Sequence, residues 1–375
     1  MGRNGAILRK LCPSVVGTGL VALDVVLNVD ADADGSLHCF AGGTCGNVLT
    51  VLSYLGWSAR PVGRLSPGPA ADRVLSDLRQ WNVATAFLSV DADGSTPIII
   101  QRIGRRATGQ RYHTFSWRCP ACGAHLPGYK PVLANIAQQL AERLPAAQVF
   151  FFDRVSRGSL HLATKASENG AVVVFEPSGI GDPSLFREAW ALAHVVKYSH
   201  ERLRDIADLD LRPSEREGIL LEIETLGEEG LRYRSCLPKS PRRRWTSLPA
   251  FRVPELKDSA GSGDWCTAGL LNKLTRGGLR TLKKAAPETV RQAFRYGQAL
   301  AAWNCGFEGA RGGMYEVDHA TFHRQLEQIL EGGEFEPPSL EKQDPVLEQL
   351  LASLCPACEK ADLPVRAPRR TGSKR

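Results

Sequence analysis

The chain has 375 residues, of which 43% are hydrophobic and 23% are charged, so it is long and apolar enough to bury a large core. Its formal net charge of +7 comes partly from the basic segment 366–375, which leaves the body of the chain mildly basic. This balance suits a pocket for anionic ligands such as nucleotides but does not indicate a nucleic-acid partner, and we do not expect one.

The N-terminal segment bears on localisation. It differs from a signal peptide because Asp24 and two glycines interrupt its apolar stretch and no small-residue cleavage pattern follows. Ala6 stands where N-myristoylation requires Ser or Thr, and no uninterrupted apolar run is long enough to span a bilayer. The sequence therefore predicts a cytoplasmic protein without a membrane partner.

The main body alternates short apolar runs with longer segments of helical period, which is typical of a sheet covered by helices on both faces. The runs are nearly continuous in apolar residues, as expected of strands buried on both faces. Strands are predicted at 15–21, 149–152, 171–175, 194–198 and 219–223, and helices at 46–55, 70–81 and 265–274. Their order predicts βαβ units and hence a mostly parallel central sheet in an α/β fold.

Two stretches, 24–40 and 96–104, break this alternation with β-rich sequence and are predicted to form strands outside the main sheet, as a small lid. An Arg-rich insertion at 105–130 follows the second of them. We expect one domain over 12–335, then a C-terminal extension at 336–358 with a short helix at 345–354, and a basic, disordered tail at 359–375.

The segment Asp258-Ser-Ala-Gly-Ser-Gly-Asp264 carries the clearest chemical signal, because it is glycine-rich and directly precedes the predicted helix at 265–274. Its small residues leave the backbone N–H groups of Ala260, Gly261, Ser262 and Gly263 open at a helix N-terminus, which favours an anion such as phosphate. A carboxylate directly after them, Asp264, is placed to take the proton of an incoming hydroxyl.

A Gly-x-Gly-Asp segment taken alone is more often a glycine-rich turn with a helix-capping aspartate. Two further motifs change that interpretation. Gly42-Gly-Thr-Cys-Gly-Asn47 opens a predicted helix near the N-terminus, and Thr225-Leu-Gly-Glu-Glu-Gly230 follows a predicted strand.

In this order and approximate spacing, the three motifs resemble the ribokinase (PfkB) family of carbohydrate and nucleoside kinases over about residues 15–313. The resemblance implies a ribokinase-like three-layer sandwich with a β lid over a sugar or nucleoside, and it implies ATP and Mg²⁺ as cofactors. It implies that Asp264 is the general base and that Ala260, Gly261, Ser262 and Gly263 form the anion hole. It further implies two binding sets. The substrate would be bound by Asp24, Gly42, Gly43 and Asn47, and the nucleotide by Thr225, Gly227, Gly230 and Asp258. Ordinary structural roles are the alternative for these substrate residues: a polar strand end for Asp24, turn glycines for Gly42 and Gly43, and a helix cap for Asn47.

The sequence departs from the family pattern at its metal motif. Where the family commonly has Asn-x-x-Glu after a strand, this chain has Ser199 in place of the asparagine and its acid displaced to Glu201. Glu201 is therefore the candidate for the magnesium shell, reached through water, and organisation of the metal by other groups remains the alternative.

Two cysteine pairs share the sequence Cys-Pro-Ala-Cys and lie far apart in the chain, at Cys119 to Cys122 and at Cys355 to Cys358. Two residues between cysteines allow both sulfurs to bind one ion, and two such pairs complete a four-thiolate structural zinc site. Buried thiols, a disulfide or a redox pair are the alternatives. A disulfide is disfavoured without an export signal, and a redox pair does not explain the duplicate.

Two functions follow from these features. The first is an ATP-dependent phosphotransferase acting on a hydroxyl of a sugar or nucleoside. The second is a non-catalytic protein of the same fold whose cysteine pairs and basic tail bind protein or nucleic acid. Asp264 favours the first, because a binding module does not need that carboxylate. Lids in this family often pair into homodimers, although the sequence leaves the quaternary state open.

Overall fold

The computed structural model describes residues 12–28, 37–105, 111–203, 209, 211, 213–239, 244–337 and 353–361. Most of the predicted helix at 345–354 and of the predicted basic tail lies outside the described residues. So do positions 29–36 of the first predicted lid stretch and 106–110 of the insertion.

The described residues form a main sheet of nine strands in the order β13-β12-β11-β10-β9-β8-β1-β4-β5. All neighbours from β11 to β5 pair in parallel, whereas β12 pairs antiparallel with both β11 and β13. The strands are β1 (Ser14–Thr18), β4 (Ser58–Leu65), β5 (Leu88–Val90), β8 (Val149–Phe152), β9 (Val172–Phe175), β10 (Val195–Ser199), β11 (Leu221–Thr225), β12 (Leu231–Ser235) and β13 (Thr246–Leu248). The mostly parallel sheet predicted from the sequence is confirmed.

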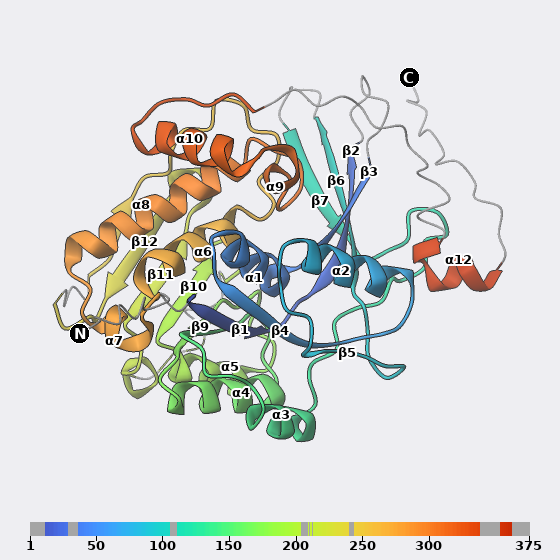
Figure 1. Cartoon of the computed structure of the whole chain (residues 1–375), viewed down its shortest axis with the longest axis horizontal. Helices are drawn as coiled ribbons and strands as arrows, with labels where there is room; N and C mark the ends of the chain where they lie inside the picture. The colour runs from blue at the N-terminus through green and yellow to red at the C-terminus, as the bar shows by residue number, and fades with distance from the viewer. Residues whose placement is uncertain are drawn as a thin grey trace, which may run out of the picture.

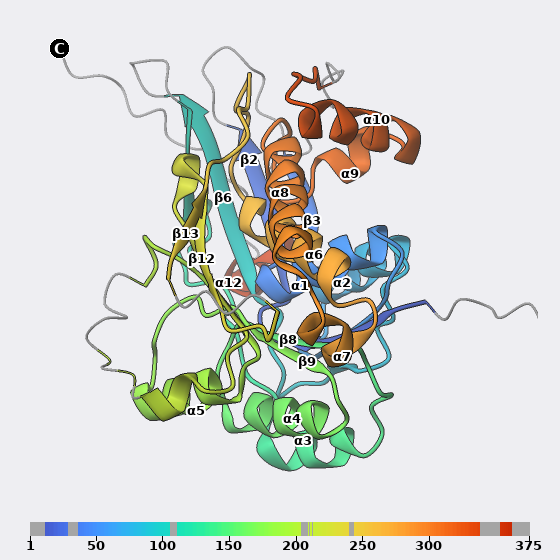
Figure 2. The ribbon, with the colours of Figure 1, turned by 90° about the vertical axis from the view of Figure 1, so that its left-hand side faces the viewer.

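Helices cover both faces of this sheet (Figures 1 and 2). One face carries α1 (Thr44–Tyr54), α2 (Pro69–Gln80), α6 (Ser262–Leu274), α7 (Gly278–Lys283), α8 (Pro287–Asn304), α9 (Gly313–Glu316) and α10 (His319–Leu330). The other carries α3 (Ala134–Ala141), α4 (Arg157–Glu168) and α5 (Pro183–Leu192). Successive strand residues alternate between the two cores: Val15 and Phe151 pack on the first face, Val16 and Phe150 on the second. The predicted three-layer arrangement is therefore present.

The strand predicted at 15–21 is too long. β1 ends at Thr18, and the chain turns at Gly19 before β2 (Ala22–Asn28) begins in another sheet. Gly19 has φ +142°, and a Cβ there would lie 1.8 Å from Oδ1 of Asp153. The N–H of Leu20 donates to the same oxygen at 2.9 Å. The apolar run hides this turn because the strands on both sides of it are buried.

A second, four-stranded sheet has the order β3-β2-β6-β7, with β3 (Leu37–Gly42), β6 (Ile98–Arg105) and β7 (Arg111–Ser116). β2 and β3 come from the first stretch predicted to lie outside the main sheet, β6 from the second, and β7 from the insertion that follows. This sheet extends away from one end of the main body (Figure 1). None of the helices in the described ranges is long and apolar enough to cross a membrane.

Candidate active site

The glycine-rich loop predicted from the sequence leads into the N-terminus of α6. Gly261 is the N-cap residue and has φ +73°, and a Cβ there would lie 2.4 Å from the carbonyl oxygen of Ala310. Only glycine fits this backbone and this contact. In the first turn, the N–H of Ser262 donates to the carbonyl oxygen of Ser259 at 3.3 Å. The N–H groups of Gly263 and Asp264 have no intrahelical acceptor, so they form a donor set for an anion.

The N–H of Ala260, which the sequence assigned to the same donor set, is used elsewhere. It donates to Oδ1 of Asp258 at 3.0 Å, so the turn itself occupies this donor. The donor set therefore begins later in the loop than the sequence prediction placed it.

Asp258 holds the loop in place. Its side chain is fully buried and accepts hydrogen bonds from the N–H of Ala260 and the N–H of Gly309, both at 3.0 Å. It also contacts Nε2 of Gln101 on β6 at 2.5 Å and Nδ1 of His113 on β7 at 2.9 Å. The carboxylate thus connects the loop to the second sheet, and the residue predicted for nucleotide binding is engaged within the protein.

Asp264 lies half-buried in the first turn of α6. Burial raises the pKa of its carboxyl to about 7, and the negative charge of Glu176 adds to this effect. The hydrogen bond from Asn47 and the positive charges of Lys197 and Arg202 lower the pKa. Nδ2 of Asn47 donates to Oδ2 of Asp264 at 2.8 Å. A carboxyl that titrates near neutrality is suited to general-base catalysis.

A buried ion pair lies beside this turn. Nζ of Lys197 contacts Oε1 of Glu176 at 2.6 Å, and the hydroxyl of Thr267 donates to Oε2 of Glu176 at 2.6 Å. Nζ of Lys197 lies 3.6 Å, and Oε1 of Glu176 3.9 Å, from the position that a Cβ of Gly263 would take. The pair is therefore adjacent to the backbone of the predicted anion hole.

The residues predicted for the substrate lie together around the start of α1. Asp24 is on β2, Gly42 ends β3, Gly43 is the N-cap of α1, and Asn47 lies one turn later. A Cβ at Gly42 would lie 1.9 Å from Oδ2 of Asp24, so this glycine permits the close approach. Burial raises the pKa of Asp24 to about 6. Because Asn47 contacts Asp264, this group adjoins the candidate base.

Three of the four residues predicted for the nucleotide lie where β11 ends and the chain turns to β12. Thr225 ends β11, Gly227 begins the short helix η3 (Gly227–Glu229), and Gly230 follows that helix before β12. Gly227 has φ +62° and Gly230 φ +98°, both in the left-handed region. Glu201 is exposed in the turn after β10, which pairs in parallel with β11. The carboxyl ends of parallel strands are the usual ligand-binding edge of such sheets.

Three residues near the base were missed at the sequence level: Glu176, Lys197 and Arg311. Arg311 is 1% exposed, and its Nε donates to Oδ1 of Asn47 at 3.2 Å. Only Lys197 carried a usable signal, because a lysine inside an apolar strand that is buried on both faces requires a partner.

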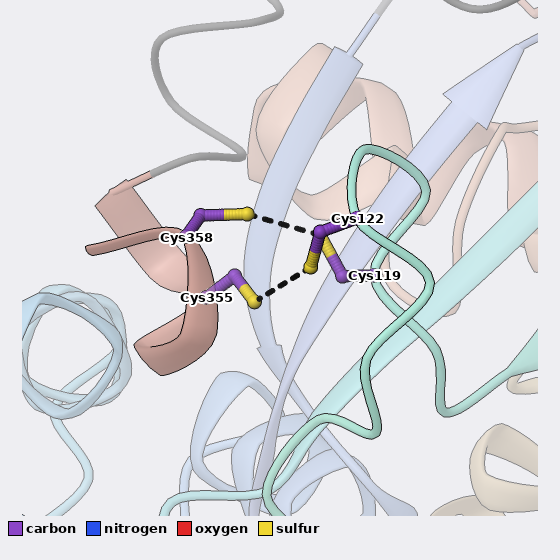
Figure 3. Close-up of side chains that lie close together, drawn as sticks. All are labelled: Cys119, Cys122, Cys355 and Cys358. Carbon is purple, nitrogen blue, oxygen red and sulfur yellow. Dashed lines mark hydrogen bonds between the residues drawn. The ribbon is translucent and has the colours of Figure 1, made fainter. Parts of the chain in front are cut away.

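The four patterned cysteines meet at a second location (Figure 3). All four sulfurs lie within 4.8 Å of one another, with Sγ–Sγ distances of 3.8 Å between Cys119 and Cys358 and 3.7 Å between Cys122 and Cys355. A tetrahedral ion with metal–sulfur bonds of about 2.3 Å separates its thiolates by roughly 3.8 Å, whereas a disulfide needs about 2 Å. The arrangement therefore fits a metal and not a disulfide.

The first pair follows β7, and the second belongs to α12 (Pro356–Ala361) and the residue before it. The main-chain N–H of Ala124 lowers the pKa of the Cys122 thiol, whereas burial raises the pKa of the Cys119 and Cys358 thiols.

Comparison with known proteins identifies the family. A model of the pfkB family carbohydrate kinases matches residues 13–316, which is most of the chain. The chain belongs to this family. The resemblance predicted from the three glycine motifs is thereby confirmed, as is the class of carbohydrate or nucleoside kinase.

Three similar proteins share a low sequence identity with this pfkB family member. Mouse ketohexokinase is 23% identical over 80% of this chain and 98% of its own. A fructokinase from Vibrio alginolyticus is 26% identical over 68% of this chain and 82% of its own. The structure of a Burkholderia thailandensis nucleoside kinase in complex with inosine is similar with a TM-score of 0.61 and 16% identity, over 87% of this chain and all of that one. This likeness confirms the ribokinase-like fold.

Proposed function

We propose that the protein is an ATP-dependent phosphotransferase that phosphorylates a hydroxyl of a sugar or nucleoside. The observation that carries this proposal is the position of Asp264 in the first turn of α6, where a carboxyl with a pKa near neutrality adjoins open backbone donors. A protein that only binds partners would not need this arrangement, so the geometry favours an enzyme over the non-catalytic alternative.

The chemical step follows from these positions. Asp264 takes the proton of the substrate hydroxyl, whose oxygen forms a bond to the γ-phosphorus of ATP while the bond to the bridging oxygen breaks and ADP leaves. The open backbone N–H groups of Gly263 and Asp264 stabilise the negative charge on the transferred phosphoryl group. Ala260 and Asp258 contribute by fixing the shape of the loop, since their N–H and carboxylate bind each other.

Asp24, Gly42, Gly43 and Asn47 are proposed to bind hydroxyls of the substrate, because they adjoin the base and include buried polar atoms. Oδ1 of Asp24 is buried and has no hydrogen-bond partner among the described residues, as expected of a group that awaits a ligand. Thr225, Gly227 and Gly230 are proposed to shape the nucleotide site at the same edge of the sheet.

The residues present also fit Mg²⁺, which the family implies and which would neutralise phosphate charge when bound with ATP. The negative charge of Glu176 raises the pKa of Asp264, so two carboxylates lie close together beside the proposed phosphate position. Glu176 is a second candidate for the metal shell beside Glu201, which is exposed after the neighbouring strand.

The names of three relatives, a ketohexokinase, a fructokinase and a nucleoside kinase, support a proposal for the substrate class. We propose a ketose or a nucleoside, with the second sheet closing over it as a lid that excludes water. Pairing of this sheet with that of a second copy is our proposal for the quaternary state.

We further propose that Cys119, Cys122, Cys355 and Cys358 bind one structural zinc ion. Four thiolates at tetrahedral spacing are typical of closed structural zinc sites. The ion would hold the C-terminal segment on the loop that follows β7. We propose the cytoplasm as the compartment, because thiols stay reduced there and can bind zinc.

A screen for ADP release tests the proposed function. The protein is incubated with ATP and Mg²⁺ and with single ketoses, aldoses or nucleosides, and ADP formation above the substrate-free rate is measured. We expect one of these classes to give saturable turnover. Absence of turnover with every sugar and nucleoside would contradict the proposal.

A further inference from the structure

A buried arginine lies behind the proposed base and has no role in the chemistry described so far. Arg311 lies between α8 and α9 and is 1% exposed. Its Nε donates to Oδ1 of Asn47 at 3.2 Å, and its Nη2 donates to Oδ2 of Asp77 at 2.9 Å. Nη2 also donates to the carbonyl oxygen of Ala41. The guanidinium therefore connects α1, α2 and the end of β3.

The contact with Asn47 determines how its amide is oriented. A guanidinium has donors only, so the amide atom that faces Nε of Arg311 must be the oxygen. The amide nitrogen must then point the other way, where it lies 2.8 Å from Oδ2 of Asp264. A rotated amide would place its oxygen against the carboxylate and its NH₂ against the guanidinium, and both contacts would be repulsive. This assignment follows from chemistry and does not depend on telling nitrogen from oxygen.

We propose that Arg311 is a positioning residue of the phosphoryl-transfer site, which fixes the Asn47 amide so that its NH₂ holds one oxygen of Asp264. The other carboxylate oxygen is then oriented toward the substrate hydroxyl. The role of Asp264 as base rests on the proposed function, whereas the contacts from Arg311 through Asn47 to Asp264 do not.

Titratable and charged groups surround both Asp264 and Arg311. Around Asp264 they are Glu176 after β9, Lys197 on β10, Arg202 after β10 and the Cys45 thiol on α1. Around Arg311 they are Asp24 on β2, Asp77 on α2 and Tyr315 on α9. Among the groups that lower the pKa of Asp264, the hydrogen bond from Asn47 has the largest effect. Loss of the amide orientation should therefore raise that pKa.

The test is a direct titration of Asp264 that does not require turnover. The full chain is labelled with aspartate carrying ¹³C at the carboxyl carbon, and Asp264→Asn assigns the resonance. We expect Arg311→Met to raise the Asp264 pKa by about one unit or more, the size expected for a lost hydrogen bond to a charged group. Asn47→Ala should raise it similarly. The two changes together should do no more than Asn47→Ala alone, because both remove one interaction.

Asp77→Asn is the matched control. It neutralises the acidic partner of Arg311 but leaves the bond to Asn47, so the Asp264 titration should stay in place. Because Arg311→Met leaves the carboxylate of Asp77 without its guanidinium, the double variant Asp77→Asn/Arg311→Met serves if the single one does not fold. An unchanged Asp264 titration in a folded Arg311 variant would overturn the proposal. An equal shift in Asp77→Asn would also overturn it.

Enzyme kinetics separate this inference from the proposed function. If a substrate is found, the acidic limb of the pH profile of kcat/KM should move to higher pH in Arg311→Met by the same amount as the titration. If the titration shifts as expected but no sugar or nucleoside accepts phosphate, the proposed function fails and the positioning role of Arg311 stands.

Discussion

Replacing Gly261 by alanine should destabilise the protein and displace the proposed anion hole. The residue has φ +73°, a conformation that costs an alanine about 1–2 kcal/mol. The added Cβ would lie 2.4 Å from the carbonyl oxygen of Ala310, whereas real contacts almost never fall below 3.0 Å, so the loop or its neighbour must move by about 0.6 Å. Relief of such overpacking costs roughly 1–3 kcal/mol more, so the free energy of unfolding should fall by about 2–5 kcal/mol.

Gly56→Ala is the matched control for urea unfolding. Gly56 has φ +85°, but no atom of the described residues lies within 4 Å of the position of its Cβ, so only the backbone cost of about 1–2 kcal/mol applies. Gly261→Ala should also lower kcat roughly tenfold to hundredfold, since displacements near 1 Å in a catalytic site have effects of this size. If both variants lose the same stability, the contact with Ala310 does not fix the loop and the reasoning is refuted.

Three further predictions concern the loop, the cysteines and the base. Asp258→Ala removes a carboxylate with four contacts, three of them buried, and should lower the free energy of unfolding by about 3 kcal/mol or more in urea titrations. A loss below about 1 kcal/mol would argue against its holding role. Elemental analysis of the purified protein should find one zinc ion per chain. Cys122→Ser should reduce this zinc content. Cys236→Ser, which changes an exposed cysteine outside the cluster, should leave it unchanged. The value of kcat/KM should fall as pH decreases through about 7, because protonation of Asp264 removes the base, and a profile flat from pH 8 to 5 would contradict that role.

Much of the fold could be predicted from local sequence. Strands buried on both faces appear as continuous apolar runs, and α1 and α2 begin and end within two residues of the positions that their periodicity predicts. The turn at Gly19 could not be predicted, because it lies inside an apolar run and is fixed by Asp153, which is distant in sequence.

The active site, like the fold, could be predicted from the sequence only in part. The loop from Asp258 to Asp264 is contiguous, so its chemistry is visible in the sequence, and the two cysteine pairs could be matched because each contains the same spacing. Glu176, Lys197 and Arg311 come from separate elements, and only tertiary structure brings them to the base. The use of the Ala260 N–H by Asp258 was also hidden, since the same residues suit either an anion hole or a turn.

The most direct test of the account compares phosphate transfer by the wild-type protein and Asp264→Asn. The asparagine keeps the size of the side chain and the N-terminus of α6 but cannot accept the proton, so ATP binding should persist. With the substrate found in the ADP-release screen, kcat should fall by about 10²–10⁴-fold, the range that general-base catalysis contributes. Turnover within a few-fold of the wild type would show that Asp264 is not the base and would contradict the central claim.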